Sequence, residues 1–166
     1  MAALLGQIGL ELTLSCISGF TSAASSIFYI TDVVSTYKGE NAKIITTILD
    51  LDIANSVKVL EQLLNELEIT EESSNTLHIC IKSLHDVIKQ IEHEFSEIQN
   101  KLEYNRSLYV FKNLRSCKFN NTIKRLTTLK SILDNRRDLL FRTISMDSVV
   151  LKKKEVQESE VDKLVL

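Results

Sequence analysis

The most constraining feature of this chain is a run of apolar residues between positions 77 and 102, in which the spacing alternates between four and three residues without interruption. Such spacing places every apolar side chain on one face of an α-helix. Cys80 and Val87 widen this face, which favours a helix that packs against two neighbours in an intramolecular bundle. An isolated coiled-coil dimer would show the same repeat. The run comprises Leu77, Ile81, Leu84, Ile88, Ile91, Phe95, Ile98 and Leu102.

The rest of the chain also favours long helices. Its 166 residues contain no proline and only four glycines, so the usual helix breakers are missing from nearly the whole length. We predict further helices over residues 3–37, 43–68 and 119–144. The predicted fold is all-α: a four-helix bundle of long helices over residues 1–144, followed over residues 145–166 by a short C-terminal amphipathic helix or a mobile tail.

Local signals refine two of these helices. Asp50 and Asp52 interrupt the apolar stretch in the predicted helix 43–68, and Ser74 is one of several candidate N-caps before the heptad run. The apolar face predicted for residues 43–68 consists of Leu49, Ile53, Val57, Leu60, Leu64 and Leu67. The inward face predicted for residues 119–144 consists of Phe119, Ile123, Leu126, Leu129, Leu133 and Leu140.

The opening segment has the length of a membrane span but an unusual composition. Leu12 to Thr31 are twenty consecutive uncharged residues, which as a helix would rise about 30 Å, the thickness of a bilayer core. Eight of the twenty are Ser or Thr, and no basic residue precedes Lys38, which argues against a permanent anchor and a secretory signal. We expect a bundle wall that is buried at rest and enters a membrane conditionally, through Leu4, Leu5, Ile8, Ile17, Phe20, Ile27, Phe28 and Ile30.

Charge is distributed unevenly along the chain. Residues 1–104 hold 15 acids and 6 bases, whereas residues 105–154 hold 3 acids and 13 bases. A polybasic helix is a candidate site for anionic phospholipids or phosphoinositides. It could equally neutralise the acidic faces of the preceding helices. Nucleic acid is not expected, because aromatic residues are sparse and the isoelectric point is about 5.9. The candidate lipid-binding residues are Lys118, Lys124, Arg125, Lys130, Arg136, Arg137 and Arg142.

Catalytic and metal-binding motifs are not recognisable. His78 and His85 share a helical face, but two turns separate them by about 10.5 Å, too far for one zinc ion, so we expect surface histidines. The carboxylate pairs Glu71–Glu72 and Glu92/Glu94 are interpreted as solvated helix residues. No phosphate-binding loop or nucleophile motif is present. We expect no enzyme activity and no cofactor. The cysteines, Cys16, Cys80 and Cys117, are interpreted as reduced core thiols of an intracellular protein.

The arrangement resembles the N-terminal four-helix-bundle (HeLo-like) domain of the mixed lineage kinase domain-like cell-death family, which is related to fungal HeLo and plant resistance-protein helical domains. The resemblance rests on the uncharged opening helix with Gly6, Gly9 and Gly19, the acidic helix from Ile44 to Leu67, the heptad run, and the corner at residues 107–119 leading into residues 122–126. It covers residues 1–144, and residues 147–166 occupy the position of the family's brace helix. The opening helix is more apolar than in animal members and closer to the fungal and plant versions.

This resemblance implies a cytoplasmic cell-death executor that relocates to membranes. Activation would free the bundle, a homo-oligomer would form, basic residues would engage anionic lipid, and the membrane would be permeabilised. The matching basic positions are Lys124, Arg125, Lys130, Arg136, Arg137 and Arg142. A kinase-type or other signalling partner would regulate it, although no kinase-like domain follows in this sequence, and the chain could be a self-standing domain or part of a longer protein. The alternative is a non-lytic protein-interaction or scaffolding bundle in intracellular signalling.

Overall fold

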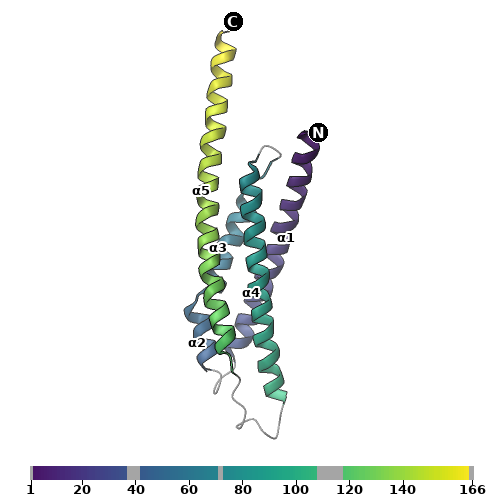
Figure 1. Cartoon of the computed structure of the whole chain (residues 1–166), viewed down its shortest axis with the longest axis vertical. Helices are drawn as coiled ribbons and strands as arrows, with labels where there is room; N and C mark the ends of the chain where they lie inside the picture. The colour runs from purple at the N-terminus through teal and green to yellow at the C-terminus, as the bar shows by residue number, and fades with distance from the viewer. Residues whose placement is uncertain (1, 37–41, 71–72, 108–117, 165–166) are drawn as a thin grey trace.

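The computed structural model describes the backbone of residues 2–36, 42–70, 73–107 and 118–164, and the side chains of residues 9–36, 42–70, 73–107 and 118–147. Every regular element in these ranges is an α-helix, which confirms the all-α class (Figure 1). The helices are α1 (Ala2–Ser35), α2 (Ala42–Asp50), α3 (Ile53–Glu66), α4 (Asn75–Ser107) and α5 (Asn120–Leu164).

Helix α4 is the centre of the assembly. It packs along α1 and along α5, and α1 also packs against α3. Helices α1 and α4 run in the same direction, because Thr13 contacts His78 while Gly19, further along α1, faces His85, further along α4. Helices α3 and α5 run the opposite way (Figure 1). The helix with the heptad run therefore has two long neighbours, as its widened apolar face predicts.

The core follows the predicted apolar faces closely. All eight residues of the heptad run are at most 3% exposed, and Cys80 and Val87 are buried beside them. In α5 the predicted inward residues are buried, except Ile123, which packs against the core while partly exposed. Burial of apolar surface on this scale is the main stabilising term for such a fold.

The prediction of a single helix over residues 43–68 is wrong in one respect. The backbone breaks at Asp52, which has the left-handed φ of 48°, so that α2 and α3 are separate helices. Asp tolerates this conformation because its short polar side chain bonds locally, and here Asn55 donates a hydrogen bond to Asp52 Oδ1 at 2.6 Å. The break also shifts the helical phase. Ile44 and Ile48 are therefore buried in α2, whereas Leu49 is 56% exposed.

Helix α5 is longer than the sequence indicates. It continues without interruption from Asn120 to Leu164, so the predicted helix 119–144 and the segment after it are one helix, whose last turns extend beyond α1 and α4 (Figure 1). Asp147 joins this helix to the start of α4: its Oδ2 accepts a hydrogen bond from Ser74 Oγ at 2.8 Å. Ser74 Oγ in turn accepts one from the Leu77 amide at 3.2 Å, as expected of an N-cap.

Candidate functional site

Helix α1 presents the predicted membrane-insertion residues mainly to the protein core. Phe20, Ile27 and Ile30 are at most 3% exposed. Ile17 and Phe28 are partly exposed and pack against the same core. The side chains of Leu4, Leu5 and Ile8 lie outside the described residues. In this arrangement, most of the described insertion candidates can reach lipid only after α1 separates from α4.

The hydroxyl groups of α1 are divided between its two faces. Ser15, Ser18, Ser22 and Ser25 recur at intervals of three and four residues and are exposed. Thr13, by contrast, is buried between helices and donates a hydrogen bond to the Gly9 carbonyl at 2.9 Å. The outer face of the uncharged segment therefore carries serines, together with the exposed side chains of Leu12, Leu14 and Tyr29. By length and composition, residues 9–35 form a helix that could cross a membrane, a test that a core helix also passes.

The expectation of surface histidines is wrong for His78 and His85, because both lie half-buried between α1 and α4. Nδ1 of His78 is 2.6 Å from Thr13 Oγ1. The ring of His85 packs directly on Gly19, where the missing side chain makes room for it. The spacing of the glycines does not predict these contacts, because Gly9 and Gly19 are ten residues apart whereas His78 and His85 are seven apart.

The candidate lipid-binding residues divide into two groups. Arg125, Lys130 and Arg137 form ion pairs within the protein: Arg125 Nε lies 2.7 Å from Glu94 Oε1, Lys130 lies 2.7 Å from Asp134, and Arg137 reaches both Asp134 and Asp138. The other four are exposed and have no ionic or hydrogen-bonding partner of their side chains among the described residues. These are Lys118, Lys124, Arg136 and Arg142.

Two of the unpaired cations share one face of α5. Lys124 and Arg142 are eighteen residues apart, which is five helical turns, so both side chains leave the helix in the same direction about 27 Å apart. Arg136 lies roughly a third of a turn round the helix from them. In the sequence all seven basic residues belong to one set of candidates. The packing of α5 against α4 accounts for the pairing of Arg125 with Glu94. Lys130 and Arg137 pair within α5 instead, with Asp134 and Asp138, at short helical spacings that are already present in the sequence.

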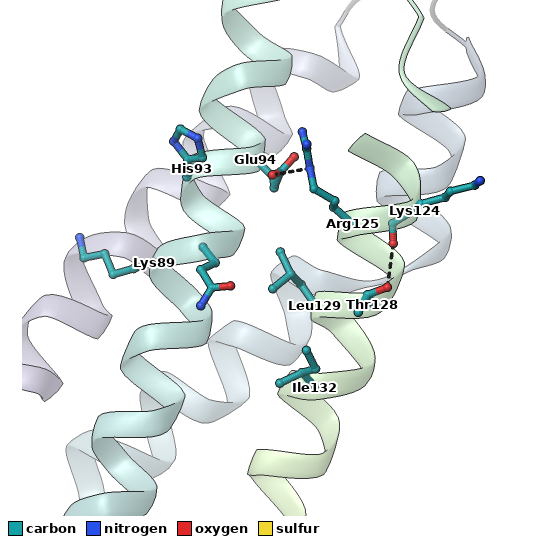
Figure 2. Close-up of a pocket in the computed structure, with 9 residues that line it drawn as sticks. Lys89, His93, Glu94, Lys124, Arg125, Thr128, Leu129 and Ile132 are labelled. Atoms are coloured by element: carbon teal, nitrogen blue, oxygen red, sulfur yellow. Dashed lines mark hydrogen bonds and ion pairs between the residues drawn. The ribbon is translucent and has the colours of Figure 1, made fainter. Parts of the chain in front are cut away.

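A groove of about 590 Å³ lies between α4 and α5. No pattern in the sequence predicts this groove. The groove is lined by Lys89, Gln90, His93, Glu94, Lys124, Arg125, Thr128, Leu129 and Ile132 (Figure 2). Lys89 is already held by Glu92 at 3.0 Å. The volume of the groove is in the range of small-molecule sites, and its lining combines apolar side chains with a few polar groups.

Glu94 is the most unusual residue of this groove. The expectation of a solvated carboxylate is wrong, because Glu94 is 7% exposed. Its Oε1 pairs with Arg125, while its Oε2 is buried without a hydrogen-bond donor among the described residues. A signal was present in the sequence: Cys80, Val87 and Glu94 are seven residues apart, so Glu94 occupies the next position of the widened apolar stripe. Glu71 and Glu72 lie outside the described residues.

Neither of the two described cysteines forms a disulfide bond: Cys80 is buried, and Cys16 is half-buried. Partial burial raises the pKa of the Cys16 thiol, Asp86 raises it further, and Lys82 opposes the shift. Cys117 lies outside the described residues. In the part of the chain whose side chains are described, no three His, Cys, Asp or Glu residues are grouped so that they could hold a metal ion.

These features have to be interpreted from their own chemistry, since comparison with known proteins offers no guide. The chain matches no protein-family model, no curated protein and no solved structure.

Proposed function

We propose that this protein is a peripheral membrane-binding four-helix bundle, with α2 and α3 together forming one of the four, that recognises anionic lipids through α5. The observation that carries the proposal is the set of exposed cations on α5 without partners among the described residues, above all Lys124 and Arg142 on one face. Each Lys or Arg near an anionic surface contributes about 1 kcal/mol to binding. Several such groups on one rigid helix would give salt-sensitive recruitment.

Helix α1 supplies a second element of this function. Its buried face is covered by α3 and α4, and between Glu11 and Asp32 its exposed face carries serines and a few apolar side chains but no charge. Release of α1 from α4 would uncover a helix of membrane-spanning length in which the twenty residues from Leu12 to Thr31 are uncharged. On this basis the proposal extends to oligomerisation and membrane permeabilisation after activation, as in the cell-death executors that the sequence resembles, with a cytoplasmic protein moving to the membrane.

The test is binding to vesicles of phosphatidylcholine with and without phosphatidylserine, using two double variants that remove the same charge. Lys124→Gln with Arg142→Gln removes unpaired cations and should weaken binding to the anionic vesicles by roughly 30-fold, since two contributions of about 1 kcal/mol are lost. Lys130→Gln with Arg137→Gln removes cations already paired with Asp134 and Asp138, and should weaken binding much less. Equal effects of the two variants, or no preference for anionic vesicles at low salt, would refute the proposal.

Permeabilisation is measured separately, as release of a trapped dye from the same vesicles. Leakage that requires phosphatidylserine supports the executor function. Binding without leakage would limit the protein to lipid recruitment.

The second candidate is a non-lytic protein-interaction bundle. It is favoured by the pairing of Arg125, Lys130 and Arg137 within the protein, which leaves them less available to lipid. In this case the chain would bind neither type of vesicle, and a pull-down would recover a protein partner whose binding survives the Lys124/Arg142 substitutions.

A further inference from the structure

The groove between α4 and α5 has two chemically different ends. Because the helices are antiparallel and Glu94 contacts Arg125, the polar residues His93, Glu94, Lys124 and Arg125 gather at one end. Leu129 and Ile132 lie further along α5, toward the other end (Figure 2). Seven residues of helix separate Arg125 from Ile132, a distance of about 10.5 Å. On α5 the lining of the groove therefore changes from charged to apolar along its length, while α4 contributes Lys89 and Gln90 opposite the apolar residues.

The guanidinium at the charged end is held in place by a buried group. Arg125 uses Nε to contact Glu94, which leaves the two terminal nitrogens and their donors available, and its side chain is 56% exposed. Glu94 side-chain exposure is only 9%, so the carboxylate is fixed by packing and orients the guanidinium. Fixed guanidinium groups bind carboxylates and phosphates well, because little side-chain freedom remains to be lost. His93 and Lys124 also line this end, and in Figure 2 the Lys124 ammonium points away from Arg125.

The apolar end of the groove exposes only part of its side chains to solvent. Leu129 is 8% exposed, and Ile132 is partly exposed and packs against the core. The one cation that also lines this part of α4, Lys89, is bound to Glu92. A hydrocarbon chain lying on these residues would remove apolar surface from water on both sides, at about 25 cal/mol for each Å² buried.

We propose that this groove binds one molecule of an anionic amphiphile, with its phosphate or carboxylate on the free nitrogens of Arg125 and its hydrocarbon chain over Leu129 and Ile132. The inference rests on the proposed function for the choice of lipid as the source of the ligand, but it concerns a groove that holds a single molecule instead of a membrane surface. The end-to-end change from charged to apolar is what favours an amphiphile. An acidic amphipathic helix would instead require an apolar strip with cations along both edges over its whole length.

The experiment follows the backbone amide resonances of the full chain during titration with decyl phosphate below its critical micelle concentration. We expect saturable shifts confined to residues 89–94 and 124–132. Inorganic phosphate should bind at least tenfold more weakly, and decyltrimethylammonium should not shift these resonances. The arms thus separate a lipid-like ligand from an anion alone and from a hydrocarbon chain alone.

Two matched pairs of variants locate the site. Ile132→Asp places a carboxylate at the apolar end and should weaken decyl phosphate binding at least tenfold, whereas Leu139→Asp, at an exposed leucine of α5 outside the groove, should not. Gln90→Glu adds a negative charge to the groove at an exposed position and should weaken binding several-fold, whereas Gln62→Glu on α3 should not. The second pair touches no core residue, so it remains informative if Ile132→Asp fails to fold.

The outcomes separate this inference from the proposed function. The inference would be overturned, and the proposed function left standing, if the protein bound vesicles but not decyl phosphate. The same holds if Gln90→Glu left the affinity for decyl phosphate unchanged. If decyl phosphate bound in the groove but the protein did not bind vesicles, the proposed function would be refuted and the groove would remain a site for anionic amphiphiles. Equal binding of inorganic phosphate and decyl phosphate would also overturn the inference, because the apolar end would then contribute nothing.

Discussion

The ring of His85 occupies the space that a side chain at Gly19 would need: a Cβ built on Gly19 would lie 2.6 Å from His85 Nε2. Helices α1 and α4 therefore approach each other closely at this point because one residue has no side chain. A similar pair, Gly9 and His78, lies nearer the start of both helices. There a Cβ built on Gly9 would lie 3.9 Å from His78 Nε2, which is an ordinary van der Waals distance. These two glycines are in similar settings but have different consequences.

Gly19→Ala should lower the free energy of unfolding by about 1 kcal/mol net, since overpacking costs more than the gain in helix propensity returns. Gly9→Ala is the control and should leave stability unchanged or raise it by up to about 1 kcal/mol, because its Cβ would make an ordinary contact. Urea denaturation followed by circular dichroism measures both. Adding His85→Ala to Gly19→Ala should recover part of the loss. A Gly19→Ala protein as stable as the parent would contradict the close approach.

At Asp52 the positive φ predicts that glycine is more stabilising than alanine, the reverse of the order found inside helices. Asp52→Gly should be more stable than Asp52→Ala by about 1 kcal/mol, because only glycine adopts the left-handed region without strain. Both variants lose the contact with Asn55, so that loss cancels in the comparison. At Asp50, which ends α2 in helical conformation, Ala should be at least as stable as Gly. Thermal unfolding of the four variants gives the two differences, and the same order at both sites would refute the break.

The pair formed by Glu94 and Arg125 should show strong energetic coupling. Arg125→Met leaves a buried carboxylate without its partner and should cost about 1–3 kcal/mol or more. Glu94→Leu combined with Arg125→Met replaces both groups by apolar ones and should cost clearly less than Arg125→Met alone, as is common for buried pairs. A double-mutant cycle by chemical denaturation measures this. Additive effects would mean that Glu94 is not confined as described.

Cys16 provides a prediction for alkaline pH. Its thiol pKa is raised in the folded state, chiefly by burial, so the thiolate forms at higher pH than in the unfolded chain. The folded state therefore disfavours deprotonation, and the free energy of unfolding should fall as pH rises through the ordinary thiol range toward the raised pKa. The midpoint of the iodoacetamide alkylation rate against pH should lie higher in the folded than in the urea-unfolded protein.

Tryptic peptides make the cysteine measurement specific, because Cys16 lies alone in residues 1–38, Cys80 in residues 59–82 and Cys117 in residues 116–118. Restricted access alone would slow alkylation at every pH without moving the midpoint. Equal midpoints for the folded and unfolded chains would therefore contradict the raised pKa.

Local sequence determined the helical class and most of the core. The heptad run, the absence of proline and the face of residues 119–144 led directly to buried positions, because helical periodicity fixes which side chains share a face once a helix forms. Ser74 was one of several candidate N-caps in the sequence, and its contact with the Leu77 amide shows that it caps α4. The break at Asp52 was visible in the sequence as an interruption of the apolar stretch. A change of backbone conformation at one residue, however, depends on how α2 and α3 pack. The burial of Ile48 instead of Leu49 depends on the same packing.

The candidate site depended on tertiary structure to a greater degree. The sequence by itself determined that α5 is basic, that α1 is uncharged and that Glu94 falls in an apolar stripe. Only the antiparallel packing of α4 and α5 decided that Arg125 is paired with Glu94 while Lys124 stays exposed, and that a groove lies beside them. The physical reason is that periodicity specifies directions around one helix, whereas pairing and enclosure depend on the register between two helices far apart in the chain.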